Sequence, residues 1–133
     1  MDYVLIFKAL GDETRFRILN LFVQCNQQLC VCEMEDALQL PQYTISKALN
    51  ILRHAGLMVS GKQGLWVYNE LNTESEFARS FFQLLKINLK NKYAEDIARL
   101  HKRLSLREDN VCVIGVPLRD KLDEEVQKRF FTR

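Results

Sequence analysis

Residues 40–57, LPQYTISKALNILRHAGL, contain the strongest structural signals in the chain. Pro41 suits the first turn of a helix, where its missing N–H would have no partner, and Gly56 suits the residue that ends one. Three apolar residues between them recur at helical spacing and predict one buried face. They are Ile45, Leu49 and Leu52. We therefore expect an amphipathic helix from Pro41 to about residue 54.

Three shorter helices are expected before this segment. Residues 2–10 carry apolar side chains at helical spacing. Asp12 is a favourable N-cap for a second helix over residues 13–24, whose core face carries aromatic and aliphatic side chains. A third helix is expected from about Val31 to Leu38. Together with the helix after Pro41, it predicts a helix-turn-helix.

The spacing of apolar residues changes after Gly56. Residues 57–60 and 65–71 are predicted as two strands around a glycine-bearing turn. A hairpin that follows such a helix pair is typical of a winged helix. The predicted fold class is therefore mainly α with a small β-hairpin wing (α+β), a winged helix-turn-helix.

One long helix is expected from about Ser75 to Leu104, and it would measure roughly 45 Å. A small domain cannot cover a helix of that length, so we expect part of its face to meet a second copy of the chain. Residues 1–104 are predicted to form the DNA-binding and dimerisation domain, followed by a C-terminal extension over residues 105–133. In the extension, residues 111–116 are apolar and β-like, and residues 123–131 suggest an amphipathic helix.

The composition is consistent with one globular domain. The chain has 133 residues, of which 47% are hydrophobic, and a formal net charge of +2. Its first residues lack a basic start and a small-residue cleavage site, so we expect no signal peptide. No apolar run approaches the roughly 18 residues of a membrane span. We expect a cytoplasmic protein without a membrane partner, whose four cysteines are reduced.

The distribution of charge favours a nucleic-acid partner. Residues 37–69 contain no Asp or Glu but include Lys47, Arg53 and Lys62. Such a window can approach a phosphate backbone without like-charge repulsion. In a winged helix the recognition helix enters the major groove, and its N-terminal residues reach base edges. The residues that we expect to contact double-stranded DNA are Gln42, Tyr43, Thr44, Ser46, Lys47, Asn50, Arg53 and Lys62.

Cys30-Val31-Cys32, at the expected start of the third helix, suggests a thiol site. Thiols at helix N-termini have lowered pKa values, and the thiolate is the metal ligand. Residues i and i+2 of a regular helix point about 200° apart. We therefore expect binding of one ion by both thiols to distort the first helical turn, so that metal and DNA bind antagonistically.

Thiolate ligands favour soft species, and As(III) or Sb(III) prefers three sulfurs. Cys112 and Cys25 are both candidates for the third ligand, with a slight preference for Cys112. A small-molecule thiol or water is a further alternative.

Several segments resemble the ArsR/SmtB family of winged-helix metalloregulators, in its arsenic-responsive branch. The resemblance spans roughly residues 4–104. It is carried by residues 7–19 (FKALGDETRFRIL), 29–33 (LCVCE), 40–49 (LPQYTISKAL), 52–57 (LRHAGL) and 61–68 (GKQGLWVY). It implies a homodimer joined through the first and last helices, an operator with an inverted repeat, and repression relieved by a metal or metalloid.

The sequence also departs from the family pattern. Glu35 stands where a third cysteine often occurs, and Ala48 stands at the family's usual histidine. The wing has only Lys62 where many members carry several arginines, so we expect a weaker grip on the minor groove.

Other functions remain open at this point. A repressor of the same fold that responds to cadmium, lead or zinc would need further ligands, of which the last long helix offers only Asp96 and His101. A redox switch would join Cys30 or Cys32 in a disulfide. A thiol enzyme is disfavoured, because neither a neighbouring histidine nor a Cys-x-x-Cys motif is present. A winged helix used only for protein contacts is a further alternative.

Overall fold

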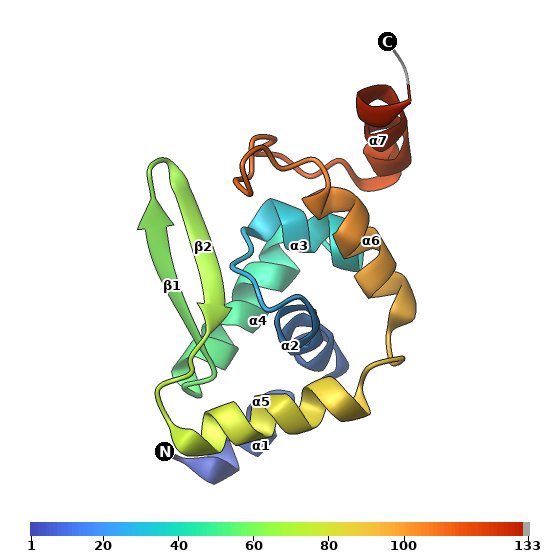
Figure 1. Ribbon diagram of the computed structural model, residues 1–133. Helices are drawn as coiled ribbons and strands as arrows, with labels where there is room; N and C mark the ends of the chain where they lie inside the picture. Colours follow the sequence, from blue (N-terminus) through green and yellow to red (C-terminus); the bar gives the residue numbers. More distant parts are fainter. Residues whose placement is uncertain (132–133) are drawn as a thin grey trace.

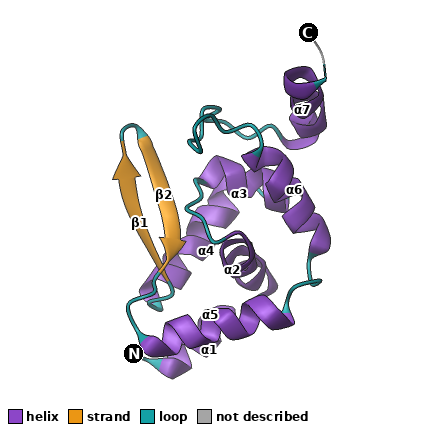
Figure 2. Ribbon diagram, in the orientation of Figure 1, coloured by secondary structure: helices purple, strands orange, loops and turns teal. Residues whose placement is uncertain are grey.

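A computed structural model describes residues 1–131 of the chain (Figures 1 and 2). The elements in chain order are α1 (Tyr3–Leu10), α2 (Glu13–Cys25), α3 (Val31–Leu38), α4 (Gln42–His54), β1 (Met58–Gln63), β2 (Trp66–Leu71), α5 (Glu76–Asn88), α6 (Ala94–Leu104), the 3₁₀ helix η1 (Arg119–Lys121) and α7 (Leu122–Phe130). The fold is mainly helical with one antiparallel hairpin in the described part of the chain. The predicted fold class, a winged helix-turn-helix, is confirmed.

Short polar side chains determine where the first two helices begin. The carboxylate of Asp2 accepts a hydrogen bond from the Leu5 N–H at 3.0 Å, and that of Asp12 accepts one from the Arg15 N–H at 3.1 Å. Each bond satisfies an N–H group that has no partner inside its helix. At the other end of α2, Asn26 adopts a left-handed conformation (φ 52°), which ends the helix.

Helix α2 lies at the centre of the hydrophobic core, where it packs against α1, α3, α4, α5 and α6. Its side chains Ile18, Leu19 and Phe22 are fully buried, as the helical spacing predicts. The inner face of α4 packs against α2 and contributes to the same core. Its buried residues are Ile45, Ala48, Leu49 and Leu52. Burial of each large aliphatic side chain contributes about 1.5–3 kcal/mol, so these faces hold the helix-turn-helix together.

The wing, residues 58–71, is a two-stranded hairpin that projects from the helical body (Figure 1). Its strands pair antiparallel, with Met58 opposite Leu71 at the base. Gly64 in the connecting turn has a φ of 61°, a conformation that favours glycine. Met58 and Tyr68 are buried against the body, whereas the tip is exposed. Strand β1 begins one residue later and ends three residues later than predicted, whereas β2 begins one residue later and ends at the predicted residue.

The expectation of one long helix over residues 75–104 is wrong. Helix α5 ends at Asn88, α6 starts at Ala94, and Tyr93 between them adopts a left-handed conformation (φ 55°). The break turns α6 back so that it packs against α3 (Figure 2). Leu100 and Arg103 of α6 become buried in this contact. Tertiary packing outweighs the helical pattern, because most of a helix's stability in a protein comes from the face that it buries.

In the C-terminal segment, residues 105–118 fold against α3, and α7 packs against α6. Leu106, Cys112 and Leu122 are buried there. The β-like expectation for residues 111–116 is wrong: they form a loop, and one isolated bridge joins Glu108 to Val111. The loop's polar backbone groups bond to side chains of α6 and α3 instead of a neighbouring strand. Helix α7 covers residues 122–130, close to the range of 123–131 that was expected for an amphipathic helix.

Residues 105–131 thus pack on the rest of the chain, and the division at residue 104 stays a prediction. None of the helices within residues 1–131 is long and apolar enough to cross a membrane.

We expect Leu52→Ala to lower the free energy of unfolding by about 2–5 kcal/mol, because the side chain is fully buried and its loss leaves a cavity. Urea denaturation followed by circular dichroism measures the change. Leu65→Ala is the matched control, since Leu65 at the tip of the wing is 97% exposed. An equal loss of stability in both variants would contradict the packing described for α4.

Candidate thiol centre and DNA-binding surface

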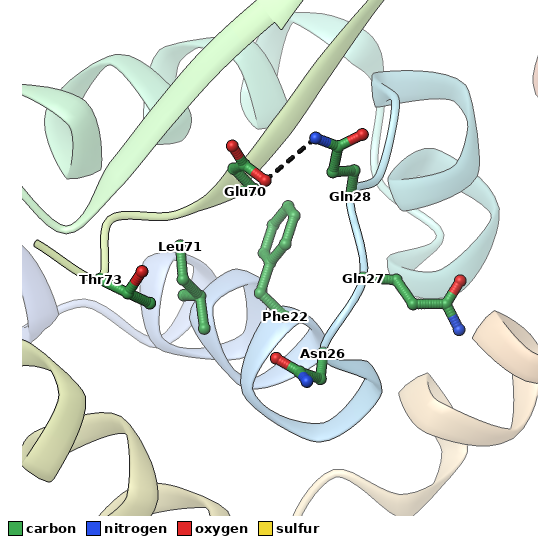
Figure 3. A pocket seen from close by; sticks show the side chains of 7 residues that line it. All are labelled: Phe22, Asn26, Gln27, Gln28, Glu70, Leu71 and Thr73. Carbon is green, nitrogen blue, oxygen red and sulfur yellow. Dashed lines mark hydrogen bonds between the residues drawn. The ribbon is translucent and has the colours of Figure 1, made fainter.

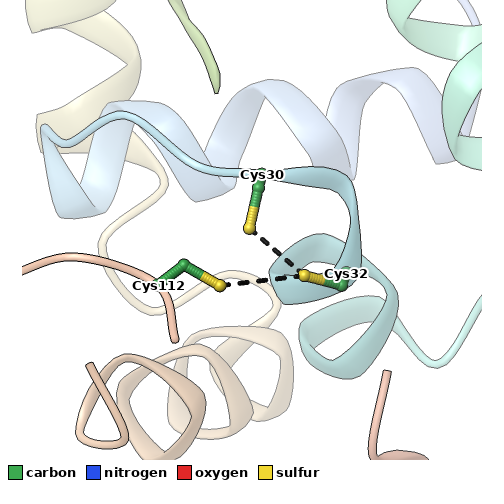
Figure 4. A group of neighbouring side chains, drawn as sticks. All are labelled: Cys30, Cys32 and Cys112. Carbon is green, nitrogen blue, oxygen red and sulfur yellow. Dashed lines mark hydrogen bonds between the residues drawn. The ribbon is translucent and has the colours of Figure 1, made fainter. Parts of the chain in front are cut away.

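Three cysteine side chains meet near the start of α3 (Figure 4). The Sγ atoms of Cys30 and Cys32 lie 3.2 Å apart, and those of Cys32 and Cys112 lie 3.9 Å apart. All three Sγ atoms lie within 4.8 Å of one another, and all three side chains are buried. We refer to Cys30, Cys32 and Cys112 as the thiol cluster.

The cluster forms without any distortion of α3. Cys30 is the N-cap, and its backbone is extended (φ −91°, ψ 163°), so it is not part of the helical turn that contains Cys32. The 200° separation of residues i and i+2 holds only inside a helix. The expectation that both thiols can approach one ion only if the first turn of α3 unwinds is therefore wrong.

Cys112 reaches the cluster because residues 105–118 fold across the start of α3. The Ile114 carbonyl oxygen lies 3.3 Å from Sγ of Cys112 and 3.6 Å from Sγ of Cys32. Cys25 is not part of the cluster. Its thiol is half-buried and lies 3.9 Å from the Gln27 carbonyl. Of the two candidates for a third thiol, the fold brings Cys112 to the pair and leaves Cys25 outside.

A buried ion pair holds this loop in place. Arg103 on α6 donates to Asp36 on α3 at 3.0 Å, and both side chains are almost fully buried. The same guanidinium donates to the Ile114 carbonyl and lies 3.5 Å from the Cys32 sulfur. The second oxygen of Asp36 accepts the backbone N–H of Leu118 at 2.7 Å. The pair thus connects α3, α6 and the loop that carries Cys112.

A second ion pair flanks the cluster on the side of Cys30. Arg107 donates two hydrogen bonds of 2.7 Å to the carboxylate of Glu33, a bidentate geometry. Glu33 in turn accepts the backbone N–H of Cys30 at 3.1 Å. Arg107 also donates to the Gln28 carbonyl at 2.7 Å. Arg107 therefore binds Gln28 before Cys30 and Glu33 after it.

These supporting residues were not expected from the sequence. The available signal was three acidic residues within four positions of α3, at 33, 35 and 36, on a helix otherwise composed of apolar residues and Cys32. All three are buried, and a buried carboxylate needs a partner. The sequence could not indicate which arginine would supply it.

The three thiols do not titrate alike. The pKa of Cys112 is lowered, because the thiols of Cys30 and Cys32 donate hydrogen bonds to its thiolate and because Arg103 is close. The pKa of Cys30 is raised by its hydrogen bonds to Cys112 and Cys32, by burial and by Glu33. That of Cys32 is raised chiefly by the hydrogen bond to Cys112. The helix N-terminus was expected to favour thiolates at Cys30 and Cys32, but the contacts among the sulfurs favour one thiolate at Cys112.

The donor set fits a thiophilic ion. Thiolate sulfurs bind soft metals and metalloids, whereas hard ions prefer oxygen. The nearby carboxylates of Glu33 and Asp36 are engaged by arginines, so the cluster offers three sulfurs and no free carboxylate. A soft species with three ligands matches this chemistry.

The residues expected to contact DNA lie on the outer face of α4 and on the wing. Gln42, Tyr43, Lys47 and Asn50 are exposed, and Tyr43 is 76% exposed. Thr44, Ser46 and Arg53 are half-buried, and Lys62 is exposed on β1. Arg53 is also engaged internally, since it donates to the side chains of Asn69 at 3.0 Å and Asn50. This surface supports the expected orientation of α4, and the individual contacts stay predictions.

A cavity of about 290 Å³ lies between the end of α2 and β2, away from these residues (Figure 3). Phe22, Leu71 and polar side chains line it. Gln28 and Glu70 close one side with a hydrogen bond of 3.0 Å. None of the residues predicted for metal or DNA binding lines this cavity.

Comparisons with known proteins agree with the geometry. Residues 12–58 match the family described as "Bacterial regulatory protein, arsR family". The matched range contains Cys30, Cys32 and α4, whereas Cys112 lies outside it.

Two curated relatives and one solved structure illustrate the likeness. An uncharacterized HTH-type transcriptional regulator of Methanocaldococcus jannaschii is 51% identical over 61 residues, which cover 46% of this chain and 67% of the relative. The arsenic resistance transcriptional regulator ArsR1 of Pseudomonas putida is 43% identical over 70 residues, which cover 53% of this chain and 54% of the relative. The matches thus span about half to two thirds of these relatives.

The crystal structure of the transcriptional regulator HlyU from Vibrio vulnificus matches with a TM-score of 0.55 and 35% identity, over 65% of this chain and 85% of that chain. These relatives are named as transcriptional regulators, in agreement with the expectation that the chain is not an enzyme. The chain belongs to the arsR family of bacterial regulatory proteins.

Proposed function

We propose that the chain is a transcriptional repressor that binds operator DNA as a homodimer and is released when As(III) or Sb(III) binds Cys30, Cys32 and Cys112. The thiol cluster is the observation that carries this proposal. Its three sulfurs are buried, lie within 4.8 Å of one another and adjoin the helix-turn-helix. The arsenic resistance named for the Pseudomonas relative is consistent with such an effector.

The charges around the cluster favour a trivalent species. The cations of Arg103 and Arg107 are matched by the anions of Asp36 and Glu33. Three thiolates neutralise a trivalent metalloid, whereas a divalent cation with three thiolates would leave one buried negative charge, which is costly without a partner. A zinc site on α6 is also disfavoured, because Asp96 is engaged by Arg17 at 2.8 Å.

Operator binding is proposed through α4 and the wing. Gln42 and Lys47 can pair with adenine and guanine edges, and Tyr43, Thr44 and Ser46 can contact bases or phosphates. Asn50 and Arg53 are proposed to contact the DNA backbone, and Lys62 is proposed to contact DNA from the wing. Because linkage is reciprocal, a metalloid that weakens DNA binding must itself bind less tightly to the DNA complex.

The homodimer is proposed to form through an apolar surface on α1 and α5, where α5 is the first half of the segment expected as one long last helix. Val4 and Phe7 are 65% and 58% exposed, and Leu84 and Ile87 on α5 are 57% and 64% exposed. The rings of Phe7 and Phe81 pack edge to face with centroids 6.0 Å apart, which joins the two helices into one surface. Contiguous exposed apolar surface of this kind marks protein interfaces. Two recognition helices related by a two-fold axis would read an inverted repeat.

A redox switch is the second candidate, favoured by the 3.2 Å contact between Cys30 and Cys32. A peroxide would accept two electrons, and the thiols would lose two protons as the disulfide bond forms. This candidate requires oxidation alone to release DNA, without a specific effect of arsenite.

We expect the reduced protein to bind one equivalent of arsenite per subunit, detected by the sulfur-to-arsenic ultraviolet band. Cys30→Ser, Cys32→Ser and Cys112→Ser remove or weaken binding, because each deletes one sulfur ligand. Cys25→Ser, outside the cluster, is the control and binds normally.

Arsenite is then added to the protein bound to a DNA fragment that the metal-free protein selects. We expect arsenite to weaken the affinity for this DNA several-fold to about a hundredfold. Release by peroxide but not by arsenite would favour the redox switch. A stronger effect of cadmium, lead or zinc would favour a sensor of divalent ions.

The thiolate absorbance of the folded protein is expected to persist well below pH 8.5, about the ordinary pKa of a free cysteine. Because the pKa of Cys112 is lowered, its thiol stays deprotonated at a lower pH than an ordinary cysteine does. Cys112→Ser removes this low-pH absorbance. Cys25→Ser leaves it unchanged, because burial raises the pKa of Cys25. A single transition of all thiols near pH 8.5 would contradict the lowered pKa.

Phe7→Glu is expected to convert a dimer into a monomer in sedimentation analysis, because it places a charge in the proposed interface of α1 and α5. Leu65→Glu is the matched control, since it also adds a charge to an exposed apolar position but lies at the tip of the wing. A monomeric wild-type protein, or a dimer that tolerates Phe7→Glu, would exclude this interface.

A further inference from the structure

Asn69 on β2 connects the wing to the residue that precedes the thiol cluster. The Leu29 N–H donates to the Asn69 carbonyl at 3.0 Å, and the Asn69 N–H donates to the Leu29 carbonyl at 2.9 Å. Leu29 directly precedes Cys30, and both residues are buried. This bridge therefore connects the residue next to Cys30 to β2.

The side chain of Asn69 extends the connection to the recognition helix α4. Its Oδ1 accepts a hydrogen bond of 3.0 Å from Nη1 of Arg53, in the last turn of α4. Its Nδ2 lies 3.4 Å from the Leu29 carbonyl, to which it donates. Asn69 is only 1% exposed, so its amide has little access to water that could replace these partners. We refer to residues 28–30 as the thiol segment. The side chain of Asn69 thus contacts both the thiol segment and α4.

The neighbouring contacts restrain the thiol segment between the wing and the C-terminal loop. Gln28 donates to Glu70 on β2 at 3.0 Å (Figure 3). From the other side, Arg107 donates to the Gln28 carbonyl at 2.7 Å. The segment before Cys30 is thus held between β2 and the C-terminal loop.

We propose that Asn69 is a positioning residue that couples the thiol cluster to the recognition helix, through Leu29 on one side and Arg53 on the other. The proposal rests on the proposed function, because it concerns how occupancy of that site changes DNA affinity. Asn69 does not contact the cluster's sulfurs, and its role is to relay the position of the Cys30 segment to α4.

The proposal separates two properties that a purely structural role would change together. Asn69→Ala removes two side-chain hydrogen bonds: the one that Oδ1 accepts from Arg53 and the one that Nδ2 donates to the Leu29 carbonyl. It leaves the backbone bridge to Leu29 and all three thiols in place. Arsenite should bind Asn69→Ala with the wild-type stoichiometry and ultraviolet band. The effect of arsenite on DNA affinity should be smaller in this variant, because Arg53 no longer has a hydrogen bond that connects it to the thiol segment.

The measurement is the ratio of DNA dissociation constants with and without saturating arsenite. We expect this ratio in Asn69→Ala to be about two- to thirtyfold smaller than in the wild type. The matched control is Asn72→Ala. Asn72 also joins the base of the wing to the end of α4, by donating to the Gly56 carbonyl at 3.1 Å, but it does not bond to the segment before Cys30. Its ratio should equal that of the wild type.

Arg53→Met tests the same connection from the other end, and it covers the case in which Asn69→Ala does not fold. Methionine keeps much of the apolar stem but not the donor to Asn69. Any lost DNA contact affects both dissociation constants, so the ratio still reports coupling. We expect the ratio of the double variant to equal that of either single variant, because both changes break one link.

Three outcomes decide between the hypotheses. If arsenite does not release the wild-type protein from DNA, the proposed function fails, and the inference fails with it. If arsenite releases the wild type and Asn69→Ala equally, the inference is overturned and the proposed function stands. If Asn72→Ala loses as much coupling as Asn69→Ala, general loosening of the wing explains the effect, which also overturns the assignment to Asn69.

Discussion

The contact between α3 and α6 depends on the buried ion pair of Arg103 and Asp36. Removing one member of such a pair typically costs about 3–5 kcal/mol, because the other charge is left buried without a partner. This pair does more than join two helices. Asp36 also accepts backbone N–H groups of the C-terminal loop, and Arg103 also donates to its Ile114 carbonyl. This ion pair thus holds the loop that carries Cys112 against α3 and α6.

The thiol cluster lies where three parts of the fold meet: the start of α3, the loop after α6 and the wing. Tyr68 of β2 is buried against the cysteines, and Trp66 packs beside it. A Cβ atom on Gly115 would come within 2.2 Å of the Trp66 ring, so the loop approaches the wing as closely as a glycine allows. A ligand that changes the spacing of the sulfurs would therefore act on elements that also border the DNA-binding surface.

Two errors of sequence interpretation have the same physical origin. The apolar stripe of residues 75–104 continues across the break at Tyr93, because both halves are amphipathic and no glycine or proline marks the turn. The angle between Cys30 and Cys32 was taken from a regular helix, whereas the N-cap residue has an extended backbone. In both cases a local rule was applied beyond the end of the element to which it belongs. The helix-turn-helix was predicted well because its caps and core spacing are local signals.

Local sequence signals were enough to predict the winged helix-turn-helix, the pair Cys30 and Cys32 at the start of α3, and the polar outer face of α4. Each of these follows from residues close together in the chain, through helical periodicity, capping and turn chemistry. Three other features were not predictable from local signals: α6 turns back onto α3, Cys112 rather than Cys25 joins the pair, and Asn69 contacts both Leu29 and Arg53. These contacts join residues distant in sequence, and their partners are selected by the burial of charge and by packing, which local spacing does not encode.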